Sequence, residues 1–432
     1  MSKTETAIIK DIKLTKLVHG GQCLGDTPDG KKVFVWGGLP GELVDVRVIK
    51  KKSRYLEGIV DCIHTPSPDR IEPKEPEVYL STSPWQIMRF SAENTAKQAI
   101  LAEAFEREGV DSISWGDFYA SDMDFGYRNK LEIGFWGDDQ GIHLANYIRG
   151  THGKHIISSN ALATNAINSV ALSFISALRD YAPKIECRAG DLKTVVIRSS
   201  QAGEVVSALF VKRKLDFSAF ELPKGLKGLV VYYSDPKSPA SIPTKKLYTK
   251  GDITLTDNVG TKDITYDVLS FFQVNLPVFE QTLKVIKSTI ISKPKAKKHP
   301  IVDMYSGVGT IGLALGADVL VESDESNIVM AKKNTEGTSV EVIHATSESA
   351  LKHIKSDSII IVDPPRAGLH RDVIDRILEA KPSKIVYLSC NPSTQARDVK
   401  YLSEFYKISL AQGYNFFPRT PHIESLVVLT LS

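Results

Sequence analysis

The chain has 432 residues, too many for one hydrophobic core, and its 42% hydrophobic and 24% charged residues predict a globular protein of two or three domains. No apolar run approaches the roughly 20 residues that span a bilayer, and the first residues lack a signal-peptide core, so a cytoplasmic protein without membrane attachment is expected. The net charge of +3 permits a nucleic-acid partner but does not require one.

Residues 1–70 predict a small β-barrel. Short apolar or alternating runs, such as "KKVFVWG" and "LEGIVDCIH", are separated by turn signals such as "GLPGE". The run "KKKSR" at 50–54 concentrates positive charge in one place. On a barrel of the oligonucleotide-binding type this run would hold phosphates, and the alternative is a solvated hairpin tip.

The middle of the chain predicts a linker followed by an α+β region. Residues 64–85 are rich in proline and polar residues, as expected of a linker. A helix is predicted at about 92–108, and residues 126–268 combine β-like runs with one helix-like segment. The pattern of this region does not indicate its chemistry.

From about residue 298 the pattern changes to alternating strands and helices. Near-continuous apolar strands such as "SIIIVDPP" and "KIVYLSCNP" predict a parallel sheet with both faces covered. Ligands bind such sheets at the carboxyl ends of the strands, where every distinctive motif of this chain falls.

The first two strands of this region each end in a candidate binding residue. In "VDMYSGVGT", Gly307 and Gly309 would let a ligand approach the backbone closely, although a βα turn needs glycine for packing as well. The next strand ends in Glu322, where a nucleotide-binding sheet places a carboxylate on the ribose hydroxyls. The alternative for Glu322 is a surface acid.

Two later strand ends carry more specific groups. Asp363 ends a buried strand before two prolines that stiffen the loop, which favours a role in ligand binding over the alternative, a proline pair that merely ends the strand. Cys390 stands at the end of the next strand, so its thiol is a candidate nucleophile, whereas a buried structural cysteine is the alternative. The four cysteines lie far apart and indicate neither a disulfide framework nor a metal site. Glu424 precedes the final strand as a possible base or a solvent-facing residue.

Together these motifs resemble the RNA uracil-5-methyltransferase family, which uses S-adenosylmethionine to make 5-methyluridine in tRNA and ribosomal RNA. The resemblance covers nearly the whole chain. It rests on five blocks in the family's order: "FFQVN" at 271–275, "YSGVGT" at 305–310, "DPPRAGL" at 363–369, "SCNPSTQARDV" at 389–399 and "FPRTPHIES" at 417–425. The amino-terminal unit is similar to the TRAM domain, an RNA-binding barrel.

The resemblance implies a role for each matching residue. Cys390 would be the nucleophile that adds to carbon 6 of uracil, and Glu424 the general base. S-adenosylmethionine would contact the following positions: Gln273, Tyr305, Gly307, Gly309, Thr310, Glu322, Thr346 and Asp363. Arg366 would bind the substrate and, with Gln273, help to stabilise the enolate. The RNA would also contact Lys50, Lys51, Lys52 and Arg54 on the barrel.

The implied fold is multidomain, with an OB-like TRAM barrel, a central α+β domain and a Rossmann-like methyltransferase domain. The expected boundaries are 1–70 for the barrel, 77–95 with 126–268 for the central domain, and 96–125 with 269–432 for the methyltransferase domain. A monomer is expected. A second basic stretch, 284–298, has six lysines and would be either an RNA contact or an ordinary helix end and linker.

One departure from the family concerns the iron–sulfur cluster that many members carry. The stretch that would supply three of its cysteines reads "EVYLSTSPWQIMRF", so no cluster is expected. The expected target is a uridine in a structured loop of 23S ribosomal RNA, with tRNA as the next choice. The alternatives are methylation of cytosine at carbon 5 and a non-catalytic RNA-binding protein with a vestigial methyltransferase fold.

Overall fold

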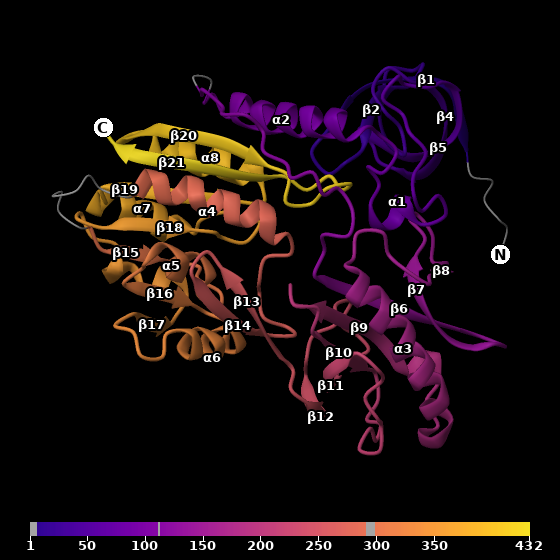
Figure 1. Cartoon of the computed structure of the whole chain (residues 1–432). Coiled ribbons are helices and arrows are strands. Elements are labelled where there is room, and N and C mark those ends of the chain that lie inside the picture. Colours follow the sequence, from indigo (N-terminus) through magenta and orange to yellow (C-terminus); the bar gives the residue numbers. More distant parts are fainter. Residues whose placement is uncertain (1–6, 111–112, 291–298) are drawn as a thin grey trace. The chain divides into compact units, whose positions relative to one another are not determined.

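A computed structural model describes residues 7–110, 113–290 and 299–432. Figure 1 shows its helices and strands, coloured along the sequence. Its internal contacts divide the chain into two compact units. Unit 1 comprises residues 1–103, 146–155 and 417–422, and unit 2 comprises 104–145, 156–416 and 423–432. The three expected domain boundaries stay a prediction. Within the described residues, no helix is long and apolar enough to cross a membrane.

Unit 1 is built on the predicted barrel. Its five strands close in the order β1-β2-β3-β5-β4. They are β1 Ile8–Leu17, β2 Cys23–Asp26, β3 Lys32–Trp36, β4 Leu43–Lys51 and β5 Tyr55–Thr65. Inward residues such as Ile12, Val33 and Val44 are fully buried, and they alternate with more exposed neighbours as expected for a sheet that encloses a core.

The segment expected as a linker, residues 64–85, is folded onto the barrel. Arg70 donates through Nε to Glu42 Oε1 at 2.6 Å and through a terminal nitrogen to the carbonyl of Gly37 at 2.7 Å. The Trp85 side chain is 1% exposed, and its indole N–H donates to the carbonyl of Gly21 at 3.0 Å. Helices α1 Tyr79–Thr82 and α2 Phe90–Arg107 follow. The linker prediction was wrong because composition alone does not reveal these long-range contacts.

The first part of unit 2 is the predicted α+β region, except for residues 146–155, which belong to unit 1. Its sheet has the strand order β12-β11-β10-β9-β6-β7-β8, and the two strands of a hairpin follow. The elements are β6 Lys130–Asp138, β7 Gly141–Tyr147, β8 Lys154–Ile156, α3 Asn165–Tyr181, β9 Leu192–Ser199, β10 Val205–Val211, β11 Leu226–Tyr233, β12 Lys245–Gly251, β13 Thr254–Val259 and β14 Lys262–Asp267. The apolar face of α3 covers this sheet with Phe174 and Leu178, both fully buried.

Residues of this first part hold the segment that leads to the second sheet. Arg198 in β9 is fully buried, and its guanidinium donates to the carbonyls of Ser270 at 2.5 Å and Phe272 at 3.0 Å. Asn129 donates through Nδ2 to the carbonyl of Gln273 at 2.9 Å. These bonds fix the backbone of the "FFQVN" block.

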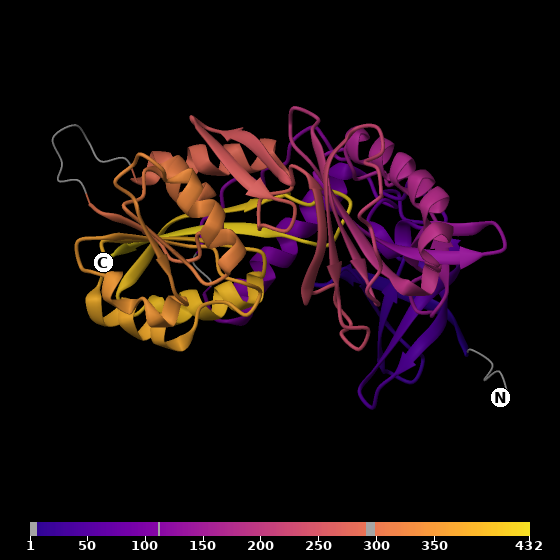
Figure 2. The ribbon, with the colours of Figure 1, turned by 90° about the horizontal axis from the view of Figure 1, so that it is seen from below.

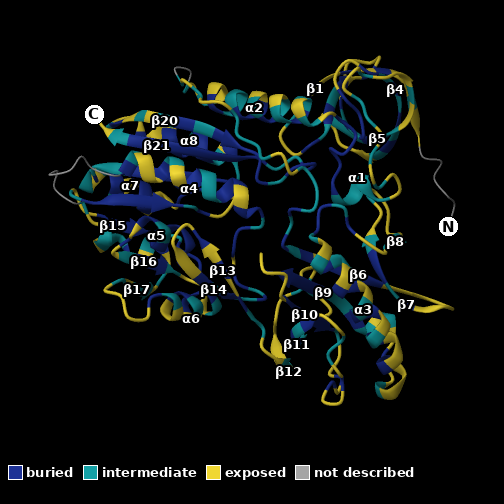
Figure 3. Cartoon of the chain, in the orientation of Figure 1, coloured by how far each residue is buried: buried dark blue, intermediate teal, exposed yellow. Residues whose placement is uncertain are grey.

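The second sheet of unit 2 has the strand order β17-β16-β15-β18-β19-β21-β20. Its strands are parallel except for β21, which runs antiparallel to both of its neighbours. Figure 2 shows helices on both faces of this sheet, as predicted, and Figure 3 shows that its strands are largely buried. The elements are α4 Leu276–Ile290, β15 Ile301–Asp303, α5 Thr310–Leu315, β16 Val319–Glu322, α6 Glu325–Asn334, β17 Glu341–His344, β18 Ile359–Val362, α7 Arg371–Ala380, β19 Lys384–Ser389, α8 Pro392–Leu402, β20 Tyr406–Tyr414 and β21 Glu424–Leu431.

Candidate active site

The register of two strands brings the predicted nucleophile and the predicted base to one edge of the second sheet. Cys390 follows directly after β19, whereas Glu424 is the first residue of the antiparallel β21. Ser389 pairs with Ser425, so the residues that follow and precede this pair lie side by side. The Glu424 carboxyl is close enough to influence the titration of the Cys390 thiol.

Cys390 has a half-buried thiol in a mainly anionic environment. Burial, assisted by the carboxyls of Glu424 and Asp363, raises the pKa of this thiol to about 11. The Arg366 guanidinium opposes the rise in pKa through its charge and a hydrogen bond. A thiol with so high a pKa is protonated at neutral pH, so Arg366 is the group that favours the reactive thiolate.

Glu424 is a buried carboxyl with unused hydrogen-bonding capacity. The residue is 6% exposed, and within the described part of the chain its Oε2 has no hydrogen-bond partner. Burial and the neighbouring Asp363 raise the pKa of Glu424 well above its ordinary value, and Arg366 lowers it. An unpartnered acceptor at this depth indicates a group that meets a ligand.

Helix α8 holds the loop that carries Asp363 and Arg366. The carbonyl of Arg366 accepts hydrogen bonds from Asn391 Nδ2 at 2.8 Å and from Thr394 Oγ1 at 3.2 Å. Asn391 is also the N-cap residue of α8. The "DPPRAGL" and "SCNP" blocks, joined by contacts between residues 25 and 28 apart, therefore form one structural unit.

A buried aspartate on α8 holds the far end of the same loop. Asp398 is fully buried, and its Oδ2 accepts from the Leu369 N–H at 2.8 Å and from the Tyr387 hydroxyl at 2.8 Å. Gly368 has φ +82°, and a Cβ on it would lie 2.6 Å from Asp398 Oδ2, so the tight turn requires glycine on both counts.

The carboxyl ends of β15 and β16 build the predicted cofactor side of the site. Glu322 Oε2 accepts from the Gly307 N–H at 2.8 Å, and its Oε1 accepts from the N–H groups of Ser323 and Asp324, each at 2.7 Å. The Ser323 hydroxyl also donates to Oε1, at 3.4 Å. Each carboxylate oxygen has about two acceptor positions, so the second position of Oε2 remains for a ligand hydroxyl. Gly309 has φ +90° directly before Thr310, the first residue of α5.

Asp303 ends β15 as a fully buried carboxyl. Its Oδ2 accepts from the Gly312 N–H at 2.9 Å, while its Oδ1 has no partner within the described residues. Burial raises the pKa of Asp303 to about 7, against the effect of the backbone N–H groups of Tyr305 and Gly312. Burial, together with Asp303, also raises the pKa of Asp363 to about 7.

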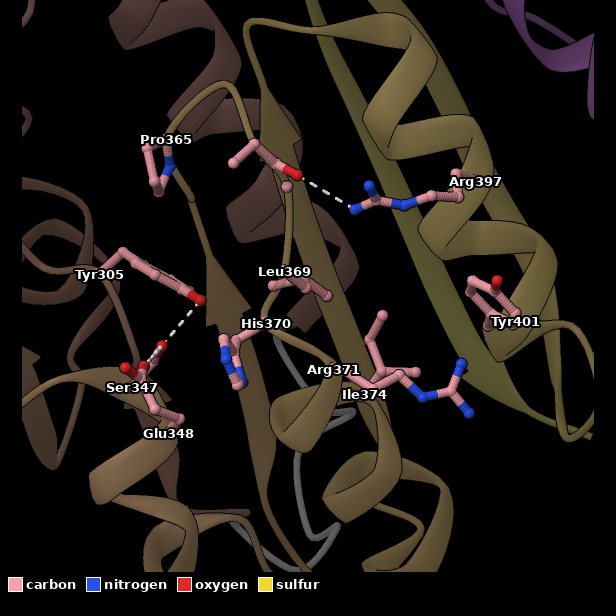
Figure 4. A pocket seen from close by; sticks show the side chains of 12 residues that line it. Tyr305, Ser347, Glu348, Pro365, Leu369, His370, Arg371, Ile374, Arg397 and Tyr401 are labelled. Carbon is pink, nitrogen blue, oxygen red and sulfur yellow. Dashed lines mark hydrogen bonds between the residues drawn. The ribbon is translucent and has the colours of Figure 1, made fainter.

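Two cavities lie along this edge and share part of their walls. The smaller, of about 150 Å³, is lined by Met304, Tyr305, Glu322, Ser323, Ala345, Thr346, Ser347 and Glu348. The larger, of about 600 Å³, is shown in Figure 4 and reaches from Tyr305 to Tyr401 on α8. Tyr305, Ser347 and Glu348 line both cavities, and the Ser347 hydroxyl donates to the Tyr305 hydroxyl at 2.8 Å.

The structure brings some of the predicted site residues together and leaves others apart. Cys390, Glu424, Asp363 and Arg366 interact electrostatically, and the predicted cofactor residues Tyr305, Glu322 and Thr346 line the smaller cavity. The side chain of Gln273 is 8% exposed, and no contact joins it to the cysteine among the described interactions.

The predicted RNA contacts Lys50, Lys51, Lys52 and Arg54 are exposed and belong to unit 1. Lys50 forms an ion pair with Glu57 at 2.7 Å. Of the basic stretch 284–298, residues 291–298 lie outside the described part of the chain. These RNA contacts stay predictions.

Sequence reasoning missed several residues of this edge. Asp303 carries a local signal, because it ends an apolar run, but the glycine turn that follows is the more specific feature of this segment. Phe271 is 60% exposed beside Gly307, whereas Phe272 next to it is buried, a difference that the sequence does not indicate. Ser347 and Asp398 carry no local signal, because their importance comes from partners 42 and 29 residues away.

Comparisons with known proteins show the family of this chain. The family model tRNA (Uracil-5-)-methyltransferase matches residues 89–432, and the TRAM domain model matches residues 4–60. An uncharacterized RNA methyltransferase of Halalkalibacterium halodurans is 30% identical over 92% of this chain and 91% of its own length. Another, from Lactobacillus johnsonii, is 26% identical over 98% of both chains.

Among solved structures, the Pyrococcus abyssi tRNA (uracil-54, C5)-methyltransferase in complex with S-adenosyl-L-homocysteine has the same fold. Its TM-score is 0.75 at 24% identity, over 97% of this chain and 99% of that chain. The predicted multidomain fold class and the predicted resemblance are confirmed. This chain belongs to the tRNA (uracil-5-)-methyltransferase family, whose members are S-adenosylmethionine-dependent RNA (uracil-5-)-methyltransferases, and it carries an N-terminal TRAM domain.

Proposed function

We propose that this enzyme methylates carbon 5 of a uridine in a structured RNA loop through a covalent adduct between Cys390 and carbon 6 of the base. Glu424 is the general base that completes the reaction. The observation that carries this proposal is the pairing of Ser389 with Ser425, which supports a thiol and a carboxyl acting on one base from adjacent strands. A target base must leave its stack to reach these groups.

The residues of this edge fit S-adenosylmethionine, which supplies an electrophilic methyl group when bound. The remaining acceptor position of Glu322 suits a ribose hydroxyl, and the smaller cavity beside it offers room for part of a nucleoside. The fully buried carboxyl of Asp303 and the half-buried carboxyl of Asp363 suit a cationic ligand, because burial raises the pKa of both and opposes their ionisation in the free protein.

Cys390 activates the base rather than carrying the methyl group. Carbon 5 of uracil is a weak nucleophile, and addition of the thiolate to carbon 6 converts the ring to an enolate that reacts at carbon 5. Arg366 favours the thiolate, and its guanidinium is a suitable donor to the enolate oxygen. Gln273 is the second donor in this proposal.

Glu424 completes the reaction by taking the remaining proton from carbon 5. Loss of this proton lets the sulfur–carbon bond break, so the electron pair returns to Cys390 and the ring regains its conjugation. A buried carboxylate with a raised pKa is a stronger base than an exposed one, which suits removal of a proton from carbon.

Two RNAs are candidate targets, 23S ribosomal RNA and tRNA. The sequence favours 23S ribosomal RNA over tRNA, whereas the family description and the Pyrococcus abyssi protein both name tRNA. The test incubates the purified full chain with methyl-labelled S-adenosylmethionine and either RNA, followed by nucleoside analysis. Labelled 5-methyluridine is expected, and 5-methylcytidine would contradict the proposal.

We also propose that the protein is a monomer. Light scattering by the purified full chain measures its mass and tests this proposal.

Two variants separate the proposed roles of the thiol and the carboxyl. Cys390→Ala should abolish methyl transfer while retaining S-adenosylmethionine binding, measured by calorimetry. Glu424→Gln keeps the shape of the side chain but removes the base, so turnover should fall by about a hundredfold or more. The adduct should then accumulate as a protein–RNA band on a denaturing gel. Normal turnover by either variant contradicts the mechanism.

A further inference from the structure

Residues 146–155 comprise the end of β7, the turn after it and the start of β8, and they present an aromatic ring and positive charge at the surface of unit 1. We call this segment the β7–β8 turn. It contains one arginine, one lysine, two histidines and no acidic residue. Tyr147 is 64% exposed, and the Lys154 ammonium lies 4.6 Å from the centre of its ring. An exposed tyrosine beside a cation is a suitable surface for a nucleic-acid base.

The β7–β8 turn is held in a defined conformation. The Ile148 N–H donates to the carbonyl of Gly153 at 2.9 Å, which closes the turn. Arg149 donates through its backbone N–H to Ser81 Oγ at 2.9 Å and through Nε to the carbonyl of Leu80 at 2.5 Å. Its guanidinium also stacks on Trp36 of the barrel, 3.8 Å from the ring centre. Arg149 therefore anchors the turn, so Tyr147 is presented on a fixed support.

The same turn lies against the strands that carry the basic run of the barrel. A Cβ on Gly150 would lie 3.3 Å from Ile49 Cγ2 in β4 and 3.2 Å from Ile59 Cδ1 in β5. The run 50–54 begins directly after Ile49, and residues 47–61 contain five lysines and arginines against two acids. The β7–β8 turn and the basic run 50–54, about 100 residues apart in the sequence, therefore contribute positive charge to one part of unit 1.

We propose that the β7–β8 turn and the basic run 50–54 form one RNA-binding surface. Tyr147 stacks on an unpaired base, and Lys154 binds an adjacent phosphate. Lys51, Lys52 and Arg54 bind phosphates further along the strand. This inference rests on the proposed function for the identity of its partner. It adds a contact outside the TRAM domain match, which ends at residue 60.

RNA fits this surface better than a protein partner does. The turn has no acidic residue to pair with a basic protein, and its exposed ring lies beside the Lys154 ammonium, which suits a base with its phosphate. Stacking accepts any base, whereas cations bind the backbone, so the surface would hold single-stranded segments without reading their sequence.

The test measures RNA binding by the full chain in a Cys390→Ala background, which prevents covalent adducts. The probe is a fluorescein-labelled oligouridylate of about 12 nucleotides, a length within the range that stacking surfaces cover. Tyr147→Ala should weaken binding by about five- to 140-fold, because stacking contributes about 1–3 kcal/mol per base. Lys154→Met should reduce the slope of log affinity against log salt concentration by about one.

Matched variants keep this test specific. Tyr147→Phe retains the ring and should bind as the parent does. Trp136→Ala removes another exposed aromatic side chain, outside the β7–β8 turn, and should have no effect. Unchanged melting temperatures confirm that each variant folds. Three results would each overturn the proposed surface. Tyr147→Ala could bind as the parent does, or Trp136→Ala could weaken binding equally. The parent could also bind neither the oligouridylate nor total tRNA.

The two proposals fail separately. Tyr147-dependent RNA binding without formation of 5-methyluridine in the catalytically intact chain contradicts the proposed function and leaves the surface in place. Formation of 5-methyluridine together with unchanged RNA binding by Tyr147→Ala contradicts the surface and leaves the function in place.

Discussion

Three carboxyl groups at the carboxyl edge of the second sheet hold their protons to a higher pH than ordinary carboxyls do. They belong to Asp303, Asp363 and Glu424. Burial raises the pKa of all three groups, to about 7 for each aspartate and well above 4.5 for the glutamate. The Arg366 guanidinium is the cation that lowers the pKa of Glu424. A ligand that brings positive charge to this edge therefore favours ionisation of the carboxyls and releases protons.

This protonation predicts that S-adenosylmethionine binds more tightly as the pH rises through 7. The cationic ligand interacts best with ionised Asp363, whose pKa in the free protein is about 7. Protons must leave on binding, so the affinity should be about tenfold higher near pH 8 than near pH 6. Calorimetry in buffers of different ionisation enthalpy measures both the affinity and the number of protons released.

S-adenosylhomocysteine is the control for that prediction, because its sulfur is uncharged. Its affinity should change less over the same range of pH. Asp303→Asn keeps an acceptor for the Gly312 N–H but removes the neighbouring carboxylate. The Asp363 pKa should fall in this variant, because Asp303 is part of what raises it, and the pH dependence should move to lower pH. Equal pH profiles for the two ligands contradict the prediction.

The loop 363–370 and helix α8 form the element that places Arg366. The loop itself has no regular structure, and its Leu369 N–H and Arg366 carbonyl are bonded by side chains of α8. Asp398 is the buried carboxylate in this arrangement, so it positions the loop without needing to touch the substrate.

Asp398→Asn should loosen the loop and slow the reaction of the thiol. The loss of charge-assisted hydrogen bonds at a buried site costs about 1.5–3 kcal/mol. With Arg366 less well placed, the pKa of Cys390 should rise further above about 11, so alkylation by iodoacetamide near pH 9 should slow. Arg366→Gln should produce the same slowing, and the double variant should add little to it. Asp375→Asn removes an exposed acid of α7 that pairs with Arg371, and it should react as the parent does.

A purely structural role for Asp398 would give a different result. In that case the variant would lower the melting temperature while the alkylation rate of the folded protein stayed at the parental value. Additive slowing in the double variant with Arg366→Gln would likewise show that the two residues act independently.

The strand ends of the second sheet could be predicted, because each carries its signal locally. An apolar run followed by a polar or glycine-rich loop placed Asp363 and Cys390 at the carboxyl edge, and the structure agrees. The pairing of β21 with β19 has no local signal, since its register depends on contacts between residues 36 apart at Ser389 and Ser425. Pattern alone therefore allows Glu424 to be either a base or a solvent-facing residue, and the structure shows that it is buried.

At the scale of the whole molecule, the chain leaves unit 2 after Phe416 and returns to it at Ile423. The intervening residues 417–422 belong to unit 1, where a buried ionic cluster holds them. Glu93 and Lys97 of α2 are fully buried and 2.9 Å apart. Glu93 accepts the Arg419 N–H at 3.0 Å, and Lys97 donates to the carbonyl of Phe417 at 3.0 Å. No sequence pattern indicates contacts that span more than 300 residues.

The cluster predicts an unequal cost for removing its two α2 residues. Arg419 has φ +64°. Its backbone N–H donates to Glu93, and its guanidinium donates to the carbonyl of Met88 at 2.6 Å, so both its backbone and its side chain are held. Glu93→Leu deprives both buried cations of this carboxylate, and a cost of about 3–5 kcal/mol is expected. Lys97→Met leaves Glu93 beside Arg419 and replaces a buried ammonium, whose pKa burial already lowers, by an apolar chain of similar length. Its cost should be smaller, and the double variant should be more stable than Glu93→Leu alone.

Urea unfolding followed by tryptophan fluorescence measures these differences in the free energy of unfolding, because Trp85 lies 5.6 Å from the Lys97 ammonium. Equal costs for the two single variants would show that Glu93 contributes only through Lys97.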